Sequence, residues 1–317
     1  MERDTKVNNK INLTIVIISF NTKVMTRECL NSIYENAGEG ATQVIVVDND
    51  SKDGTVEMIR EYFPLVELIV NSDNRGFAAA NNQGFEIAQG ELILLLNSDT
   101  IILDDVVENS VGYMLANPEV GAMGCRVLNT DMTMQSTCSG YPTLLRLLFL
   151  TIGLDRLKHL KLFDSYLLRN WKRDYERDVD VISGCYLLTR REVIEQVGPL
   201  SEDFFFFGEE TDWCLRMRKA DWALRFSPVG EIVHHGGGSV KKLNYQRDVM
   251  LTNATILLHK KNGGLVSAFL AFLILTMFNL SRAVFWSISS LWSSENKLRA
   301  KHFRQVTLKT ISMRLGK

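Results

Sequence analysis

The stretch ELILLLNSDT, residues 91–100, contains the most apolar strand candidate of the chain and ends in polar residues. Three similar apolar runs precede it: LTIVIISF (13–20), QVIVV (43–47) and VELIV (66–70). Such runs are typical of parallel strands that are buried on both faces. Segments that can form helices separate them, at 24–36, 55–62 and 76–89. This alternation predicts an α/β fold, a mostly parallel sheet flanked by helices.

Polar residues follow each of these predicted strands. Ser19 and Asn21 follow the first strand, Asp48 the second, the segment NSDNRG (71–76) the third and Asn97 to Asp99 the fourth. Ligands bind open α/β sheets at the carboxyl ends of the strands, so we expect a polar crevice along one edge. Each segment alone also fits an ordinary turn, because Asp, Asn, Ser and Gly are turn-forming residues.

The second half of the chain is less regular. Strand character returns at 180–189 and at 224–235. Between the two halves, residues 143–177 mix leucine with Arg and Lys. This mixture fits an amphipathic helix pair on a membrane surface and helices that cap the sheet equally well.

Residues 265–292 hold one charged residue, Arg282, and no acid. About 20 apolar residues are needed to span a bilayer, and Asn279 to Arg282 interrupt the run. A tilted span, a re-entrant hairpin and an in-plane helix all fit, with a buried soluble helix as the alternative. The seven Lys or Arg against one acid in 293–317 would be attracted to an anionic cytoplasmic leaflet. We expect membrane attachment through this segment.

Composition excludes several classes of protein. The 317 residues are 46% hydrophobic and 23% charged, which excludes a disordered chain. Residues 1–292 hold 29 Lys or Arg against 36 Asp or Glu, so nothing indicates the basic face that a nucleic-acid partner would need. The five cysteines are widely spaced, and the N-terminus lacks a signal-peptide core. Buried free thiols in a reducing compartment are therefore expected.

Two groups of residues could hold a divalent cation. Asp99 follows a buried strand, and a carboxylate there suits Mg²⁺ held against a diphosphate. His234 and His235, in EIVHHGGGS, follow another apolar run and offer imidazole ligands for Mn²⁺ or Mg²⁺. Taken separately, each group also fits a structural role, as an Asn/Asp turn or as a histidine pair at a strand end.

The stretch FFFFGEETD, residues 204–212, joins the densest aromatic run to the densest group of acids. It fits a pocket with an apolar floor and an acidic mouth. It also fits a core strand of phenylalanines followed by a solvated helix start, where acids are favourable.

Six motifs in order resemble the family 2 glycosyltransferases, in particular the bacterial rhamnosyltransferase-like branch. They extend over most of the chain, from about Leu13 to Gly263: VVDNDSKDGT, NRGFAAANNQG, LLLNSDT, SGCYLLTRREVIEQVG, FFFFGEETDWCLR and HHGGGS. The resemblance implies a GT-A fold, a nucleotide-diphospho-sugar donor, a divalent metal and inversion of the anomeric centre. It implies a glycosyltransferase domain over 1–262, with a nucleotide-binding half at about 11–128 and an acceptor half at about 129–262. A hydrophobic segment (263–292) and a basic tail (293–317) follow.

The resemblance also assigns roles to residues on the donor side. Ser19 and Asn21 would line the nucleotide pocket, Asp48 would contact the base or ribose, and Arg75 would lie near the nucleotide. Asn81 and Asn82 would lie on the helix behind. Asn97 to Asp99 stand where the family has Asp-x-Asp, so Asp99 would bind the metal, with His234 as partner and His235 as the fallback. Asn97 replaces the first acid of that motif.

On the acceptor side, Gly184 would lie under the acceptor and Glu210 would be the general base. Glu210 replaces the more usual Asp, which lengthens the base by one methylene, and Glu209 or Asp212 are the alternatives. Asp212 could also orient the acceptor or stabilise the helix start. A carboxylate beside apolar surface has a raised pKa, which suits a base in a single displacement.

The implied function is transfer of rhamnose or a similar hexose from a dTDP- or UDP-sugar to a lipid-linked or polysaccharide acceptor, as in O-antigen synthesis. The expected location is the cytoplasmic face of the bacterial plasma membrane. One alternative is a nucleotidyltransferase, but the loop SFNTKVMT (19–26) lacks the expected Gly-rich character. The other is a degenerate binding module, in which loss of Asp99, Glu210 and Asp212 would be expected.

Overall fold

The computed structural model describes residues 12–36, 42–157, 163–236 and 243–313. The first 11 residues, on which the expected absence of a signal peptide rests, the end of HHGGGS beyond Gly236 and the last four residues of the basic tail lie outside these ranges. The described strands are β1 Leu13–Ser19, β2 Thr42–Asp48, β3 Glu67–Val70, β4 Leu92–Asn97, β5 Thr100–Ile102, β6 Val120–Leu128, β7 Cys138–Ser139, β8 Arg177–Asp178, β9 Val181–Ile182, β10 Tyr186–Arg190 and β11 Ala223–His234. The α-helices are α1 Lys23–Asn36, α2 Thr55–Tyr62, α3 Gly76–Ile87, α4 Val106–Ala116, α5 Leu144–Ile152, α6 Arg191–Val197, α7 Glu209–Lys219, α8 Tyr245–Ser289 and α9 Ser294–Ile311. Short 3₁₀ turns, η1 and η2, occupy Leu154–Arg156 and Phe163–Ser165.

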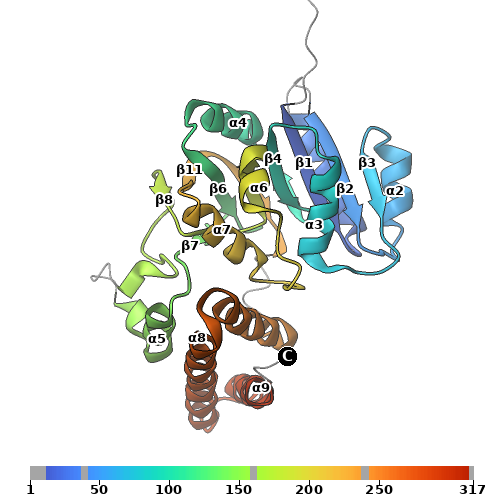
Figure 1. The fold of residues 1–317 in the computed structure, drawn as a ribbon. Helices are drawn as coiled ribbons and strands as arrows, with labels where there is room; N and C mark the ends of the chain where they lie inside the picture. The colour runs from blue at the N-terminus through green and yellow to red at the C-terminus, as the bar shows by residue number, and fades with distance from the viewer. Residues whose placement is uncertain (1–11, 37–41, 158–162, 237–242, 314–317) are drawn as a thin grey trace, which may run out of the picture.

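The main sheet has the strand order β3-β2-β1-β4-β10-β6-β11-β5, with β8 paired to β11 (Figure 1). Strands β1 to β4 are parallel, and β10 is antiparallel to both of its neighbours. The register pairs Ser19 with Asp48 and Ile18 with Asn97. The expected α/β fold is confirmed, and the polar ends of these strands do meet at one edge of the sheet.

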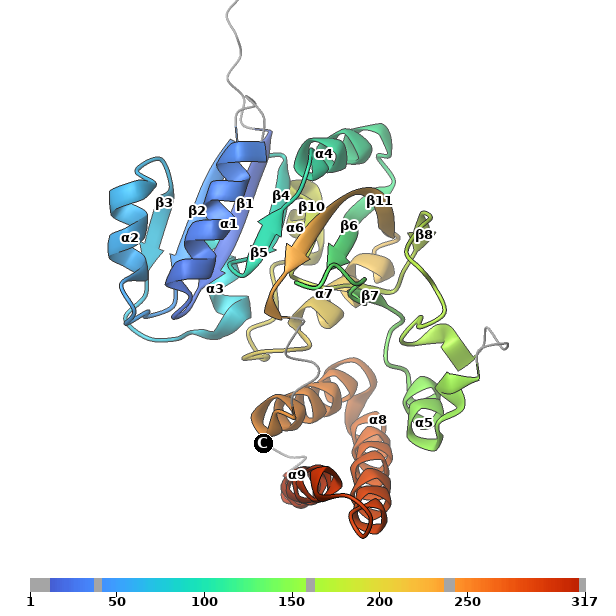
Figure 2. The same cartoon turned by 180° about the vertical axis from the view of Figure 1, so that it is seen from behind.

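Apolar side chains fill both faces of the sheet. On one face, strand residues such as Ile15 pack against α1, α2 and α4; on the other, residues such as Val16 pack against α3, α6 and α7 (Figures 1 and 2). Residues that alternate along β1 therefore enter different cores, which explains why the strand is apolar throughout.

Helix α8 changes direction at Gly264, whose φ of 74° and ψ of −173° are not helical. A first limb, 245–263, lies beneath the sheet domain, and a second limb, 264–289, packs with α5 and α9 (Figures 1 and 2). The predicted domain boundary after residue 262 falls close to this break and stays a prediction.

In the described parts of the segment 143–177, residues 143–157 and 163–177, the structure shows one α-helix, α5, followed by 3₁₀ turns and the start of β8. The helix pair that one interpretation of the sequence expected is therefore not formed by these residues. Gly153 ends α5 in the left-handed conformation, at φ 79°. Such a residue is a common stop signal for helices, and the leucines that follow therefore do not extend the helix.

Candidate active site

Asp99 lies directly after β4 and is held in place by β11. Its Oδ1 lies 3.2 Å from Nε2 of His234, and its backbone oxygen accepts a hydrogen bond from the N–H of His235 at 2.9 Å. Burial raises the pKa of Asp99. The hydrogen bond and charge of His234, together with the N–H of Gly236, lower it by more than burial raises it, so the net shift is downward. Asp99 is therefore a carboxylate at neutral pH. The structure brings together the two residues that were predicted as metal ligands.

Gln135 orients the ring of His234, and nothing in the sequence pattern singled it out. Its side-chain nitrogen donates to Asn129 Oδ1 at 3.0 Å, so its oxygen faces Nδ1 of His234 at 2.7 Å. An amide oxygen only accepts, so Nδ1 carries the proton. Nε2 donates to Asp99 Oδ1 only when the ring is charged. In the neutral ring Nε2 instead carries a lone pair beside Asp99, which can accept from the side-chain nitrogen of Asn97, 3.1 Å away, or bind a cation.

These residues fit a divalent cation. A metal-ligating histidine usually donates its other N–H to an oxygen, as His234 does to Gln135. Among the described residues, no three His, Cys, Asp or Glu side chains are grouped as a complete metal site. Mg²⁺ and similar ions are often held by one or two protein ligands plus substrate phosphates. Two protein ligands, Asp99 and His234, are therefore enough for such a site. His235, the fallback ligand, has a buried Nε2 without a hydrogen-bond partner.

The ends of β1 and β2 form a hydrogen-bonded loop system. Ser19 is fully buried and its hydroxyl contacts Thr22 and Thr26, each at 3.1 Å. Asn21 adopts φ 53° and accepts a hydrogen bond from the N–H of Lys52 at 2.7 Å. Both residues shape this end of the sheet, and their direct contact with a nucleotide stays a prediction.

Asp48 is better placed to contact a ligand. Its Oδ1 accepts from the N–H of Ser51 at 2.8 Å, whereas Oδ2 is buried without a partner. An unpaired buried acceptor is costly, and a base N–H or a ribose hydroxyl would satisfy it. Arg75, at the start of α3, is exposed on the same side of the sheet.

Helix α3 joins the two predicted halves. Asn82 is buried and bonds both main-chain groups of Leu200, at 2.9 and 3.0 Å. Asn81 donates back to the carbonyl of Phe77 within the helix. A Cβ on Gly184 would lie 3.0 Å from the ring of Phe77. Gly184 thus allows β10 to approach α3 closely, and its predicted place under the acceptor stays a prediction.

The four phenylalanines form a loop, so the core strand expected in one interpretation is wrong. Phe204 is buried, whereas Phe205 and Phe206 are 57% and 44% exposed. Phe207 and Gly208 adopt φ of 68° and 94°, which a strand cannot accommodate. The carbonyl of Phe205 accepts from the N–H of Phe77 at 3.1 Å, which places the loop against the start of α3.

Glu209 and Glu210 begin α7 directly after this loop. Burial raises the pKa of both carboxyl groups, and the charge of Glu210 raises that of Glu209 further. One oxygen of each, Oε2, is buried without a hydrogen-bond partner. Two close buried carboxyls do not ionise together easily, so the pair retains a proton to a higher pH than ordinary glutamates.

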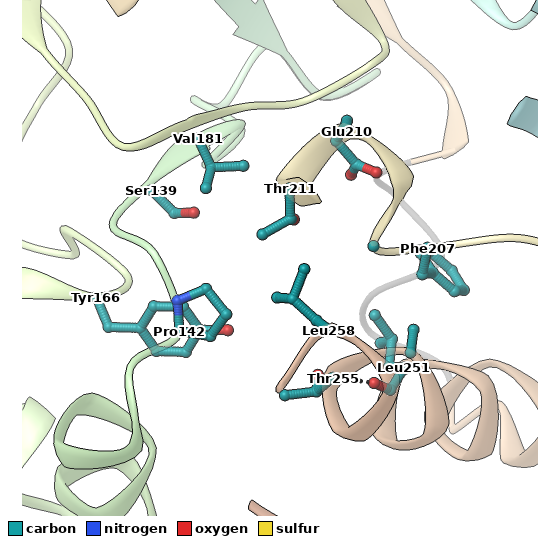
Figure 3. Close-up of a pocket in the computed structure, with 12 residues that line it drawn as sticks. Ser139, Pro142, Tyr166, Val181, Phe207, Glu210, Thr211, Leu251, Thr255 and Leu258 are labelled. Atoms are coloured by element: carbon teal, nitrogen blue, oxygen red, sulfur yellow. Dashed lines mark hydrogen bonds between the residues drawn. The ribbon is translucent and has the colours of Figure 1, made fainter. Parts of the chain in front are cut away.

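Glu210 lines a cavity of about 100 Å³ between α7, the first limb of α8 and the segment before α5 (Figure 3). Tyr166 and Pro142 form one wall, and Leu251 and Leu258 of α8 form another. Glu209 does not line it and is 3% exposed. Of the two, Glu210 is therefore the carboxyl that an acceptor in this cavity could reach.

Asp212 is fully occupied by structural contacts. It pairs with Arg216 at 2.9 Å and accepts from the side-chain amide of Asn262, on α8, at 3.1 Å. Its side chain is buried and does not line the cavity. These contacts agree with the expected stabilising role at the helix start and leave no free oxygen for a base.

Cys185 is affected by the charges of both Asp99 and Glu210. Burial raises the pKa of its thiol to about 12, and the charges of both Asp99 and Glu210 contribute to the rise. The carbonyl of Cys185 accepts from the N–H of Asn97 at 3.3 Å. Asp99, a predicted metal ligand, and Glu210, the predicted base, therefore both act on the same segment of chain; their roles stay predictions.

Comparison with known proteins identifies the family. The profile of Glycosyl transferase family 2 matches residues 14–198, more than half of the chain. The chain belongs to glycosyl transferase family 2. The match includes β1 to β4 and therefore the strand ends that carry Asp48 and Asp99.

Relatives and solved structures agree with this family 2 assignment. The chain is 27% identical over 220 residues to an N-acetylglucosaminyl-diphospho-decaprenol L-rhamnosyltransferase of Mycobacterium tuberculosis, covering 63% of this chain and 68% of that protein. It is 24% identical over 235 residues to the O-antigen biosynthesis protein RfbC of Myxococcus xanthus, covering 71% of this chain and 17% of that protein. The mannosyltransferase PcManGT of Pyrobaculum calidifontis, solved with GDP-Man and Mn²⁺, superposes with a TM-score of 0.58 at 16% identity, covering 95% and 87% of the two chains.

These comparisons confirm the predicted resemblance to rhamnosyltransferase-like members of family 2 and the GT-A fold. The protein is a glycosyltransferase that uses a nucleotide-sugar.

Proposed function

We propose that this chain transfers rhamnose or a similar hexose, with inversion, from a dTDP- or UDP-linked donor to a lipid-linked or polysaccharide acceptor of the cell envelope. The names of the relatives support the sugar and the acceptor class. The observation that carries the proposal is Glu210, a carboxyl of raised pKa that lines a cavity. Its charge and that of Asp99 both raise the pKa of the Cys185 thiol.

In this proposal Glu210 takes the proton of an acceptor hydroxyl as that oxygen bonds to C1 of the donor sugar. The bond between C1 and the phosphate oxygen breaks, and the nucleoside diphosphate leaves with its electron pair. Phe207 lines the cavity and Phe206 packs edge-on against it, with ring centroids 4.5 Å apart, which offers the acceptor an apolar contact surface. Asp48 would accept a hydrogen bond from the nucleoside.

Asp99 and His234 would hold a divalent cation, which neutralises charge on the diphosphate when it is bound. The Mn²⁺ in the similar mannosyltransferase supports this role. Asp212 holds α7 against α8, so it positions Glu210 without contacting the acceptor.

We place the protein on the cytoplasmic face of a bacterial plasma membrane. Among the described helices, α8 is long and apolar enough to cross a membrane, and only 22% of its most apolar window is buried. A lipid-linked acceptor would reach the Glu210 cavity from that side, because the first limb of α8 forms one of the cavity walls.

The test uses the full chain in detergent with dTDP-rhamnose and UDP-hexoses. Calorimetry with Mn²⁺ or EDTA measures donor binding, and transfer to a prenyl-diphosphate-linked acceptor measures turnover. Glu210→Gln is expected to bind donor normally and to lose about 10²–10⁴-fold in kcat. Glu209→Gln is the matched control and is expected to stay within a few-fold of the wild type.

Three outcomes would contradict the proposal. Retained turnover in Glu210→Gln would remove its role as base. A product that keeps the donor's anomeric configuration, as seen by NMR, would exclude the single displacement. Metal-dependent binding of nucleotide without any transfer would favour the degenerate binding module.

A further inference from the structure

A second cavity, of about 320 Å³, lies away from the Glu210 cavity, between η1, the second limb of α8 and α9. Four arginines line it: Arg156, Arg169, Arg282 and Arg299. Asp155 is the only acid among its lining residues. We refer to it as the arginine pocket.

Two of the four guanidinium groups have carboxylate partners. Arg169 pairs with Asp155 at 3.2 Å, and Arg299 pairs with Glu295 at 2.8 Å. Arg282 instead donates to the carbonyls of Thr151 and Leu150, at 2.8 and 3.0 Å, and lies 3.7 Å over the ring of Phe278. Within the described ranges, Arg156 has no carboxylate partner.

The unpaired charges act on one another. Arg156 and Arg282 line the same pocket; burial and the charge of Arg156 lower the pKa of Arg282, and the charge of Asp155 opposes this shift. Arg282 is also partly removed from water, which makes the repulsion more costly. A bound anion would relieve it, and planar guanidinium groups match the oxygens of a phosphate.

The pocket itself is partly apolar, with Phe278, Trp286 and Phe303 among its lining residues, and the helices that line it also carry exposed apolar side chains. On the same helices, Phe285 and Ile288 are 58% and 55% exposed, and Leu291 and Trp292 in the turn before α9 are 76% and 77% exposed. A site for a small soluble anion has no need of such a border. The acyl chains of a lipid would cover it, and tryptophan is favoured at the membrane interface.

We propose that the arginine pocket binds the phosphate of an anionic phospholipid headgroup, with the acyl chains lying against the exposed apolar residues around it. The pocket shares no lining residue with the Glu210 cavity, so its phosphate is a surface anchor and not part of the acceptor. The inference stands whether or not the proposed sugar transfer is correct.

Flotation of the full chain with vesicles tests this inference. Phosphatidylcholine vesicles are compared with vesicles that also contain phosphatidylglycerol. Arg156→Gln is expected to weaken binding to the anionic vesicles about fivefold or more, since a basic residue at such a surface contributes strongly. Lys309→Gln, an exposed change on α9 outside the pocket, and Arg60→Gln on α2 are matched controls and should change it less than twofold.

The melting temperature in detergent separates binding from folding. Because Arg156 repels Arg282, Arg156→Gln should melt at the same temperature as the wild type or higher, so weaker binding cannot come from unfolding. Equal losses in Arg156→Gln and Lys309→Gln would overturn a specific pocket. So would binding that does not depend on phosphatidylglycerol. A third outcome would reassign the pocket to the acceptor. In it, the protein would bind phosphatidylcholine vesicles that contain polyprenyl diphosphate as well as it binds the anionic vesicles, and Arg156→Gln would lose sugar transfer.

Discussion

Gln135 determines which nitrogen of His234 can face a metal. The residue belongs to no recognisable motif and lies 99 positions before the histidine. Its oxygen binds the proton on Nδ1, which leaves Nε2 as a ligand beside Asp99. Gln135 can therefore affect metal binding through His234 without touching the ion itself.

We therefore expect Gln135→Leu to weaken Mn²⁺ binding in the presence of a nucleoside diphosphate about 10–100-fold. Titration followed by electron paramagnetic resonance measures this affinity directly. Asn36→Ala, which removes another side-chain hydrogen bond far along α1, serves as the control. An unchanged Mn²⁺ affinity in Gln135→Leu would show that His234 does not bind the ion.

Glu209 is the carboxyl for which the structure predicts a pH-dependent cost. Its pKa in the folded protein is raised above the ordinary 4.5, so the folded state binds the proton more tightly than the unfolded state does. The contribution of Glu209 to the free energy of unfolding is then greatest below pH 4.5 and falls as the pH rises toward the raised pKa.

Glu209→Gln removes this cost and should raise the melting temperature at about pH 8, by about 2–4 °C for each kcal/mol recovered. At about pH 4 the two proteins should melt together, because the carboxyl is then protonated in both states. Differential scanning fluorimetry across this range measures the difference. A gain that is equal at both pH values would mean that ionisation of Glu209 is not its cause.

The start of α3 and the phenylalanine loop approach each other too closely for a side chain at Gly76. Its φ is 80°, and a Cβ there would lie 2.5 Å from the carbonyl oxygen of Phe205. Gly112, in α4, has a helical position and no atom within 4 Å of where its Cβ would be. The two glycines form a natural matched pair.

Gly76→Ala should destabilise the protein by about 1–3 kcal/mol, through left-handed strain and the displaced Phe205 carbonyl. Gly112→Ala should stabilise it by about 0.5–1 kcal/mol, because alanine is the better helix former. Urea unfolding gives both values. The same sign for both changes would contradict the close contact between α3 and the loop.

The elements that the sequence predicted well are those whose burial leaves a regular pattern. Leu13–Ser19 and Leu92–Asn97 are apolar on both faces because each lies inside the sheet, and their ends were placed within one or two residues. The phenylalanine loop was harder, since its path depends on the positive φ of Phe207 and on a bond to Phe77. Apolar composition cannot report either feature.

Some residues of the candidate site could also be predicted from the sequence, and others could not. Asp99 and Glu210 could be predicted because each belongs to a motif at the end of a strand or the start of a helix. Gln135 could not be, because only the tertiary fold brings it to His234. The segment 180–189, where strand character was predicted, contributes to two strands, because Val181–Ile182 pairs with β7 in a separate small sheet.

The order of strands in the whole sheet does not follow the order of the chain. Strand β10 lies between β4 and β6, and it is antiparallel to both. Both neighbours come from the first half of the chain, whereas β10 begins only at Tyr186.

During synthesis, β4 and β6 therefore emerge well before the strand that joins them. Until Arg190 has left the ribosome, each carries an unpaired edge of buried, strongly apolar sequence. Such edges are the usual starting points for aggregation. We therefore expect slow translation between residues 128 and 190 to lower the yield of folded enzyme.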